Sequence, residues 1–206
     1  MDKETLETIV KNVIKNMKNA SSATQWDDYV PIISEKDTHY VYLAEQFNDP
    51  SNYNKLCHML ITASEYETFV LMINSPGGML DSAFMIVDAI RFSKAKVNCR
   101  LTGTVASAAT IVVMACEDII VSPNLAFMVH NYSSGIQGKG HEMRARQIFI
   151  DNQLAKAFES YYLGFLTEDE IKDVIEGKDL WMGDEEVMQR WKNKKKFSKS
   201  SQEGVS

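Results

Sequence analysis

The sequence lacks a hydrophobic run long enough to cross a lipid bilayer. Its longest apolar stretch covers residues 106–116 and is interrupted by Ser107 and Thr110, whereas a membrane-spanning helix needs about 20 residues. The chain starts with the polar segment Met1–Glu4 and lacks the basic and apolar regions of a secretory signal. We therefore predict a cytoplasmic protein with no membrane partner.

Cysteine is scarce and metal-binding patterns are missing. The three cysteines Cys57, Cys99 and Cys116 are far apart and form no CxxC pair, so neither a disulfide framework nor a zinc site is expected. No histidine or carboxylate cluster has metal-ligand spacing, and the glycine motifs that cradle phosphates are absent. The sequence thus predicts neither a metal nor another cofactor.

Positive charge is in deficit as well. The chain has 22 basic and 28 acidic residues, a formal net charge of -6. This balance favours solubility and argues against nucleic acid as the main partner. Hydrophobic residues make up 45% of the 206 residues, which is enough for the core of one sizeable domain.

The two ends of the chain differ from its middle. Residues 1–38 are expected to form an N-terminal amphipathic helix and a linker, because apolar residues from Leu6 to Met17 recur with the spacing of one helix face. This apolar stripe either packs on its own domain or joins subunits, and the sequence leaves both open. Residues 192–206 are rich in lysine and serine and are predicted to be a basic, disordered tail.

Between these ends, residues 39–191 show strands that alternate with helices. This order predicts one α/β domain with right-handed crossovers. The continuous apolar run 68–73 is typical of a strand buried on both faces. Further strands are expected at 41–44, 97–101, 119–121 and 127–130, and helices near 50–61, 83–90, 107–116, 141–163, 168–176 and 184–191.

Four segments of this domain carry residues suited to catalysis, and each also has a plain structural explanation. The turn 73–78 has two glycines whose amides can face an anion, but it also fits a simple tight turn. Ser107 lies among small residues where a strand gives way to a helix, a position for a nucleophile or for a helix N-cap. His130 ends an apolar strand and suits a general base or a solvated histidine, while Asp179 in a loop is by default a surface carboxylate.

Taken together, these residues resemble the Clp protease proteolytic subunit family. Residues 73–78 read Ile-Asn-Ser-Pro-Gly-Gly, as that family does, and 103–108 match the Gly-x-Ala-Ala-Ser-Met segment around its nucleophile. Residues 128–130 match the segment that holds its histidine, and 135–138 resemble its glycine loop before a long helix. Residues 178–182 fit the segment that holds its aspartate. The resemblance extends over about residues 40–190.

The resemblance implies a serine endopeptidase with a Ser-His-Asp triad. Ser107 would be the nucleophile, His130 the general base and Asp179 the residue that orients His130, and the backbone amides of Gly78 and Ala108 would bind the oxyanion. The implied fold is the crotonase-like α/β superhelix of repeated strand-strand-helix units with a long handle helix. The implied assembly is a homo-oligomer of face-to-face heptameric rings that encloses a peptide or protein substrate.

The chain also departs from the family pattern. The methionine after the family's nucleophile is Ala108 here, and the tyrosines that help the family dock its Clp ATPase correspond to Val70 and Met72. The family's N-terminal axial segment has no counterpart. We therefore expect a divergent member, such as a phage-encoded peptidase or a capsid-maturation protease, and the sequence leaves open whether an AAA+ ATPase partner exists.

Three other functions compete with this interpretation. A crotonase-fold acyl-CoA enzyme shares the fold and the glycine-built oxyanion hole, but it needs no serine–histidine pair. A Ser-Lys dyad peptidase is disfavoured by His130 and by the lack of a membrane anchor. A catalytically altered scaffold subunit would keep the fold and lose the activity.

Overall fold

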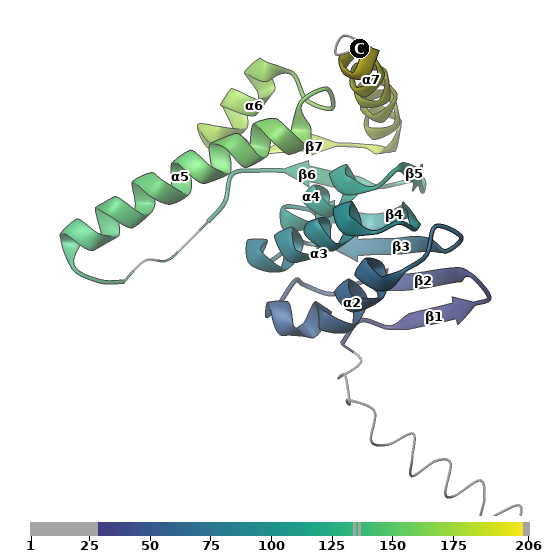
Figure 1. Ribbon diagram of the computed structural model, residues 1–206. Coiled ribbons are helices and arrows are strands. Elements are labelled where there is room, and N and C mark those ends of the chain that lie inside the picture. Colours follow the sequence, from purple (N-terminus) through teal and green to yellow (C-terminus); the bar gives the residue numbers. More distant parts are fainter. Residues whose placement is uncertain (1–28, 134, 136, 204–206) are drawn as a thin grey trace, which may run out of the picture.

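The computed structural model describes residues 29–133, 135 and 137–203 of the chain (Figure 1). The apolar stripe between Leu6 and Met17 lies outside these residues, so the helix predicted there stays a prediction.

A seven-stranded sheet organises the domain. Its order is β1-β2-β3-β4-β6-β7, with β5 beside β4. The five strands from β2 to β6 run parallel, whereas the edge strands β1 and β7 are antiparallel to their neighbours. The strands span Ile32–Glu35 (β1), Thr38–Leu43 (β2), Thr68–Ser75 (β3), Lys96–Ala106 (β4), Asp118–Val121 (β5), Ala126–Val129 (β6) and Leu180–Met182 (β7).

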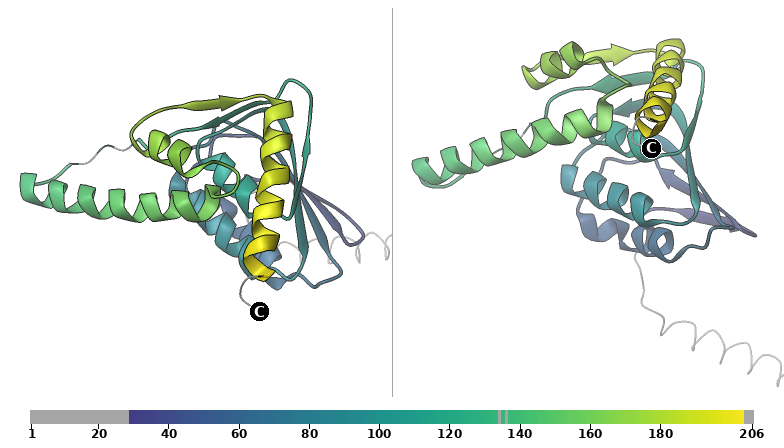
Figure 2. Two further views of the ribbon diagram at one scale, coloured as in Figure 1. Left: turned by 90° about the horizontal axis from the view of Figure 1, so that it is seen from above. Right: turned by 45° about the horizontal axis from the view of Figure 1, so that its top comes forward.

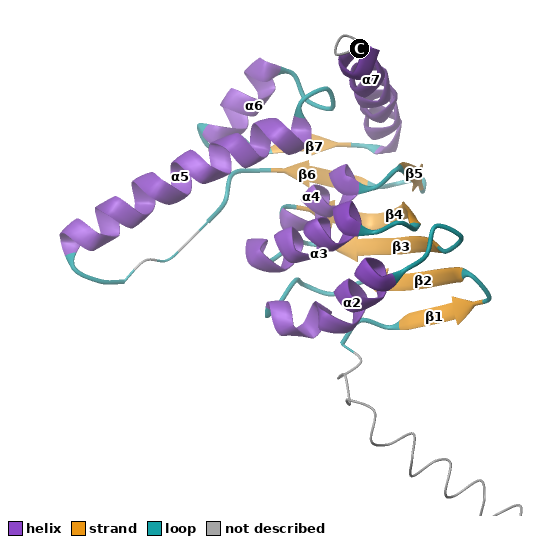
Figure 3. Ribbon diagram, viewed as in Figure 1, coloured by secondary structure: helices purple, strands orange, loops and turns teal. Residues whose placement is uncertain are grey.

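The helices connect these strands and cover one face of the sheet (Figures 1 and 3). They are the short 3-10 helix η1 (Pro50–Tyr53), α2 (Asn54–Thr62), α3 (Leu80–Phe92), α4 (Ala108–Ala115), α5 (Gly140–Tyr162), α6 (Glu168–Ile175) and α7 (Asp184–Glu203). The predicted alternation of strands and helices is therefore confirmed. Because α2, α3 and α4 each lie between two parallel strands in the chain, they are the crossovers that parallel pairing requires.

The burial of β3 shows which face the helices cover. Phe69, Leu71 and Ile73 are fully buried against the helices, whereas Val70 and Met72 on the other face are only half-buried. The expectation of a strand buried on both faces is thus wrong for the described chain. A run of apolar residues does not distinguish a covered face from one that is left open.

The helix α5 projects away from the domain as one long handle (Figure 2). Only its last part is buried, through Leu154, Phe158, Tyr161 and Tyr162. Its exposed portion carries Ile148 and Phe149, whose side chains are 62% and 63% exposed. The long helix predicted over 141–163 is confirmed, and before its buried end Gln147 and Asp151 contact the hydroxyl of Tyr132.

The folded domain begins before residue 39. Strand β1 forms a hairpin with β2, pairing Ile32 with Val41 and Glu35 with Thr38, and Val30 before it is buried. The prediction of a linker over this segment was wrong because an edge strand with polar residues shows little hydrophobic alternation.

The C-terminal segment is also more ordered than predicted. Residues 192–203 continue α7, so the prediction of a disordered tail is wrong as far as Glu203. Val187 and Trp191 bury the start of this helix, and the ring of Phe197 packs against Gly164. Val187 and Trp191 lie four residues apart on one helix face, and together with Phe197 they hold this lysine-rich segment on the domain despite its polar composition. Over the residues that the structure describes, no helix has both the length and the apolar character to cross a membrane.

Candidate active site

The backbone at Ser107 is unusual. The residue lies between β4 and α4 with φ 56° and ψ -131°, in a region that residues with a side chain rarely occupy. Such a conformation costs about 1–3 kcal/mol and persists only where the surroundings enforce it. One interaction that holds this backbone conformation is a hydrogen bond of 2.9 Å from the amide of Ser107 to the carbonyl oxygen of Met128.

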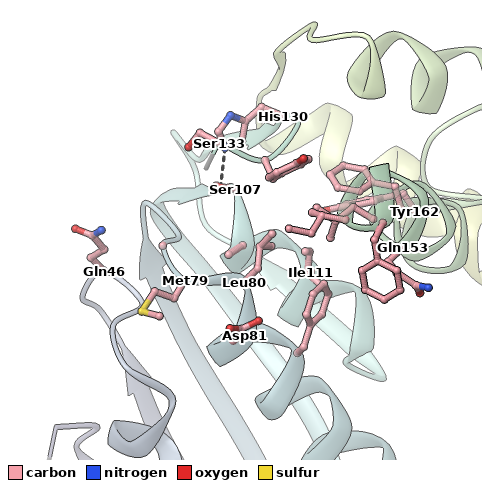
Figure 4. Close-up of a pocket in the computed structure, with 18 of the residues that line it drawn as sticks. Gln46, Met79, Leu80, Asp81, Ser107, Ile111, His130, Ser133, Gln153 and Tyr162 are labelled. Carbon is pink, nitrogen blue, oxygen red and sulfur yellow. Dashed lines mark hydrogen bonds between the residues drawn. The ribbon is translucent and has the colours of Figure 1, made fainter. Parts of the chain in front are cut away.

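The side chain of Ser107 points to His130 (Figure 4). The Oγ atom of Ser107 lies 2.7 Å from Nε2 of His130, and it makes no capping hydrogen bond to α4. The strands β4 and β6 are parallel, with Ala106 paired to Met128. The two side chains meet because both follow the carboxyl ends of neighbouring strands, where α/β sheets commonly bind ligands.

The glycine turn after β3 packs directly against Ser107. Gly77 has φ 90°, and a Cβ atom there would lie 2.5 Å from the carbonyl oxygen of Ala106 and 2.7 Å from Cβ of Ser107. Both distances are far below van der Waals contact, so any residue other than glycine would push the two turns apart. The glycines therefore reflect a close backbone approach.

Two backbone amides beside Ser107 are available to a ligand. Gly78 and Ala108 line the same cavity as Ser107, and neither amide donates a hydrogen bond to another described residue. Ala108 opens α4, where helical amides have no intrahelical acceptor. The backbone around Gly78 is held by Phe47, whose amide donates to Gly77 and whose carbonyl accepts from Met79, at 2.7 and 2.8 Å.

Asp179 is near His130 in the sheet but not in contact with it. The pairing of Val129 with Leu180 between β6 and β7 makes Asp179 the next residue opposite His130. The Asp179 side chain is exposed, and among the described residues no hydrogen bond or ion pair joins it to His130. Its neighbour Lys178 is paired with Asp173 at 2.8 Å instead.

Two residues that sequence reasoning missed link the handle helix to the serine. Thr110 Oγ1 donates to the carbonyl oxygen of Ser107 at 2.6 Å, and the hydroxyl of Tyr162 lies 2.5 Å from Thr110 Oγ1. Burial raises the pKa of the Tyr162 phenol, so the group remains a proton donor. Nothing in the sequence pattern connects these two residues, because only the packing of α5 on α4 brings them together.

His39 belongs to a separate cluster at the sheet edge. Its Nδ1 lies 2.8 Å from Ser34 Oγ and its Nε2 lies 2.9 Å from Glu67. Hydrogen bonds from the Ser64 amide and from His39 lower the pKa of Glu67 to about 2. This cluster fastens the β1–β2 hairpin to β3. Across the described residues, no group of three or more histidine, cysteine or carboxylate side chains is placed to hold a metal ion.

A cavity of about 640 Å³ adjoins Ser107 and His130 (Figure 4). Residues that follow β3 form one side, α4 contributes Ile111, and α5 forms the opposite side. The volume is within the range of sites that bind small ligands or side chains of larger ones. We call it the Ser107 cavity.

Comparison with known proteins identifies the family. The Clp protease family model matches residues 22–189. The chain is 34% identical over 139 residues to the ATP-dependent Clp protease proteolytic subunit 3 of Rhizobium meliloti (strain 1021), covering 65% of this chain and 70% of the relative. It is 34% identical over 141 residues to the ATP-dependent Clp protease proteolytic subunit 2 of Pseudomonas aeruginosa, covering 64% and 66%. Over 153 residues it is 28% identical to the corresponding subunit of Paracoccus denitrificans, covering 72% and 76%.

These matches and the architecture agree. The sheet with its crossover helices and projecting handle is an α/β protein of the crotonase-like type. The chain belongs to the Clp protease family, as a divergent member at about one-third identity to the curated proteolytic subunits.

Proposed function

We propose that this chain is a serine endopeptidase that hydrolyses peptide bonds through Ser107, His130 and Asp179. The observation that carries the proposal is the 2.7 Å contact between Ser107 Oγ and His130 Nε2, beside two unengaged amides. The names of its relatives, which are proteolytic subunits of an ATP-dependent protease, support the same chemistry. Neither the acyl-CoA enzyme nor the Ser-Lys dyad accounts for a serine paired with histidine.

The reaction begins at the serine hydroxyl. Ser107 Oγ attacks the carbonyl carbon of the scissile peptide while His130 Nε2 accepts the hydroxyl proton. When the tetrahedral intermediate collapses, the C–N bond breaks and His130 returns the proton to the leaving amine. Water then attacks the acyl-enzyme ester with His130 again as base, which releases the acid and restores Ser107.

The amides of Gly78 and Ala108 would bind the oxyanion of each tetrahedral intermediate. A donor of this kind typically contributes about 3 kcal/mol to stabilisation of the transition state. The change from the family's methionine to Ala108 leaves the backbone N–H in place, since that donor does not depend on the side chain.

Asp179 has the least support of the three side chains. The pairing of Val129 with Leu180 places Asp179 opposite His130 in the sheet. We propose that its carboxylate turns toward Nδ1 in the active enzyme, where it would hold the imidazole tautomer and stabilise the imidazolium. The exposed carboxylate is also what a catalytically altered scaffold subunit would have. A test of whether Ser107 is a reactive nucleophile distinguishes an active peptidase from such a scaffold subunit.

A fluorophosphonate probe tests the proposal, because it reacts only with an activated serine. The probe should label the wild-type protein at Ser107, and labelling should disappear in Ser107→Ala. Ser133→Ala is the matched control, because Ser133 lines the same cavity and the hydrogen bond of the His130 ring in the described chain goes to Ser107 instead. Equal labelling of wild type and Ser107→Ala, or none in either, would contradict the proposal.

A further inference from the structure

The Ser107 cavity is walled mostly by apolar side chains beyond the catalytic pair. Leu80 lies on one side, Ile111 below it, and Leu154 and Phe158 of α5 on the other. Leu154 and Phe158 are also part of the buried face of the handle helix. An extended substrate bound at Ser107 would direct one side chain into this apolar channel.

One carboxylate interrupts the apolar lining. Asp81 lies in the first turn of α3 and lines the Ser107 cavity. In Figure 4 Leu80 lies between Ser107 and Asp81, and the side chain of Asp81 is exposed. Among the described residues, no hydrogen bond or ion pair engages the Asp81 side chain.

The helix dipole explains why an acid is tolerated at this position. A carboxylate in the first turn gains stability from the positive end of the helix dipole. That gain does not depend on the cavity, and it leaves the oxygens of Asp81 free to bind a donor. A carboxylate at the end of an apolar channel suits a long aliphatic side chain that ends in a cation.

We propose that Asp81 is a specificity-determining residue that favours lysine or arginine immediately before the scissile bond. The inference rests on the proposed peptidase function and extends it to a substrate class. The methylene groups of such a side chain would pack between Leu80 and Phe158, and its charged end would meet Asp81. The contact with Asp81 would therefore favour a basic residue over an uncharged aliphatic residue of the same length.

The other charged side chain that lines the cavity is Arg146 of α5. It is exposed. It lies seven residues before Gln153, another residue that lines the cavity, and this spacing separates the two by about 10 Å along the helix axis. No ion pair within 4 Å joins it to Asp81 in the described chain. Because its charge would oppose a basic substrate side chain, its removal has the opposite expected effect.

Two peptides that differ only in the residue before the scissile bond test this inference. One carries lysine and the other norleucine, which has the same four-carbon stem without the ammonium group. Wild-type protein should cleave the lysine peptide with a higher kcat/KM than the norleucine peptide. Asp81→Asn should lower the lysine-to-norleucine ratio about tenfold, while the norleucine value stays within twofold.

The controls separate this inference from the proposed function. Asp88→Asn, an exposed acid of α3 outside the cavity, should leave the ratio unchanged, and Arg146→Gln should raise it. An unchanged lysine-to-norleucine ratio in Asp81→Asn would overturn the inference. Cleavage of either peptide would still support the proposed peptidase function. The binding of both peptides to Ser107→Ala, measured by fluorescence anisotropy, decides the preference without turnover. Equal binding there would overturn the inference as well.

Discussion

At the scale of single residues, Ser107 differs from an ordinary helix-capping serine. A capping serine turns its hydroxyl to the amides of its own helix, whereas Ser107 turns it to His130 and has a positive φ. Gly77 makes this conformation possible by leaving space behind Ser107. The strain is therefore located at the position where the chemistry is proposed.

The role of His130 can be tested at the same scale. His130→Asn should lower kcat by about 10²–10⁴-fold, the usual contribution of a general base. His141→Asn serves as the control, since His141 is exposed at the start of α5. Full activity in His130→Asn would remove the base from the proposal.

At the scale of elements, the last two helices are fastened by one ion pair. Arg190 of α7 donates to both carboxylate oxygens of Glu170 in α6, at 2.7 and 2.9 Å, and also contacts Glu186. Glu170 at the same time completes the capping box of α6 with Thr167. This pair holds α6 and α7 together beside β7, the strand that follows Asp179.

We expect Glu170→Gln to destabilise the domain by about 1–2 kcal/mol at neutral pH, because a charge-assisted pair is lost and Arg190 keeps Glu186. The hydrogen bonds from Arg190, followed by those from Thr167, lower the pKa of Glu170 from 4.5 to about 2. The contribution is therefore complete above pH 4.5 and is lost as the pH falls towards 2. Urea unfolding at several pH values measures the difference.

Glu168→Gln is the matched control for that measurement, because Glu168 is an exposed acid in the same first turn. It should shift stability by less than about 0.5 kcal/mol. A Glu170→Gln protein that is as stable as Glu168→Gln at neutral pH would contradict the role of the pair.

At the scale of the whole molecule, apolar surface remains uncovered. The handle helix exposes Ile148 and Phe149, and the open side of the sheet exposes Ile120 and Trp181, each by about 60% or more. Exposed apolar surface of this kind marks association. The family implies rings, and we propose that this chain also forms a ring-shaped homo-oligomer.

Light scattering should give a mass many times that of the 23.3 kDa chain. Ile148→Glu should reduce this mass, because it places a charge on the exposed apolar part of α5, and Asn152→Glu on the same helix should not. A monomer at micromolar concentration would contradict assembly.

We also expect no stable complex with a Clp ATPase in a pull-down, because Val70 and Met72 replace aromatic anchors, which often dominate interfaces.

How far the sequence predicts this protein depends on whether a feature is local. The order of strands and helices follows from the spacing of apolar residues along short segments, and so does the long helix α5. The edge strand β1 and the extension of α7 to Glu203 do not, because polar segments are held there by contacts with distant parts of the chain. The same limit applies to the uncovered face of β3.

The residue types of the candidate site were visible in the sequence, because the glycine turn, Ser107 and His130 each follow a strand. Only the tertiary structure decided that Ser107 and His130 meet, since parallel pairing of β4 with β6 joins residues 23 positions apart. Only the packing of α5 on α4 joined Thr110 to Tyr162 and brought Leu154 and Phe158 to the cavity that Asp81 lines. The physical reason is that periodicity records which side of an element is buried, whereas the partner on that side is chosen by the strand order and packing of the whole chain.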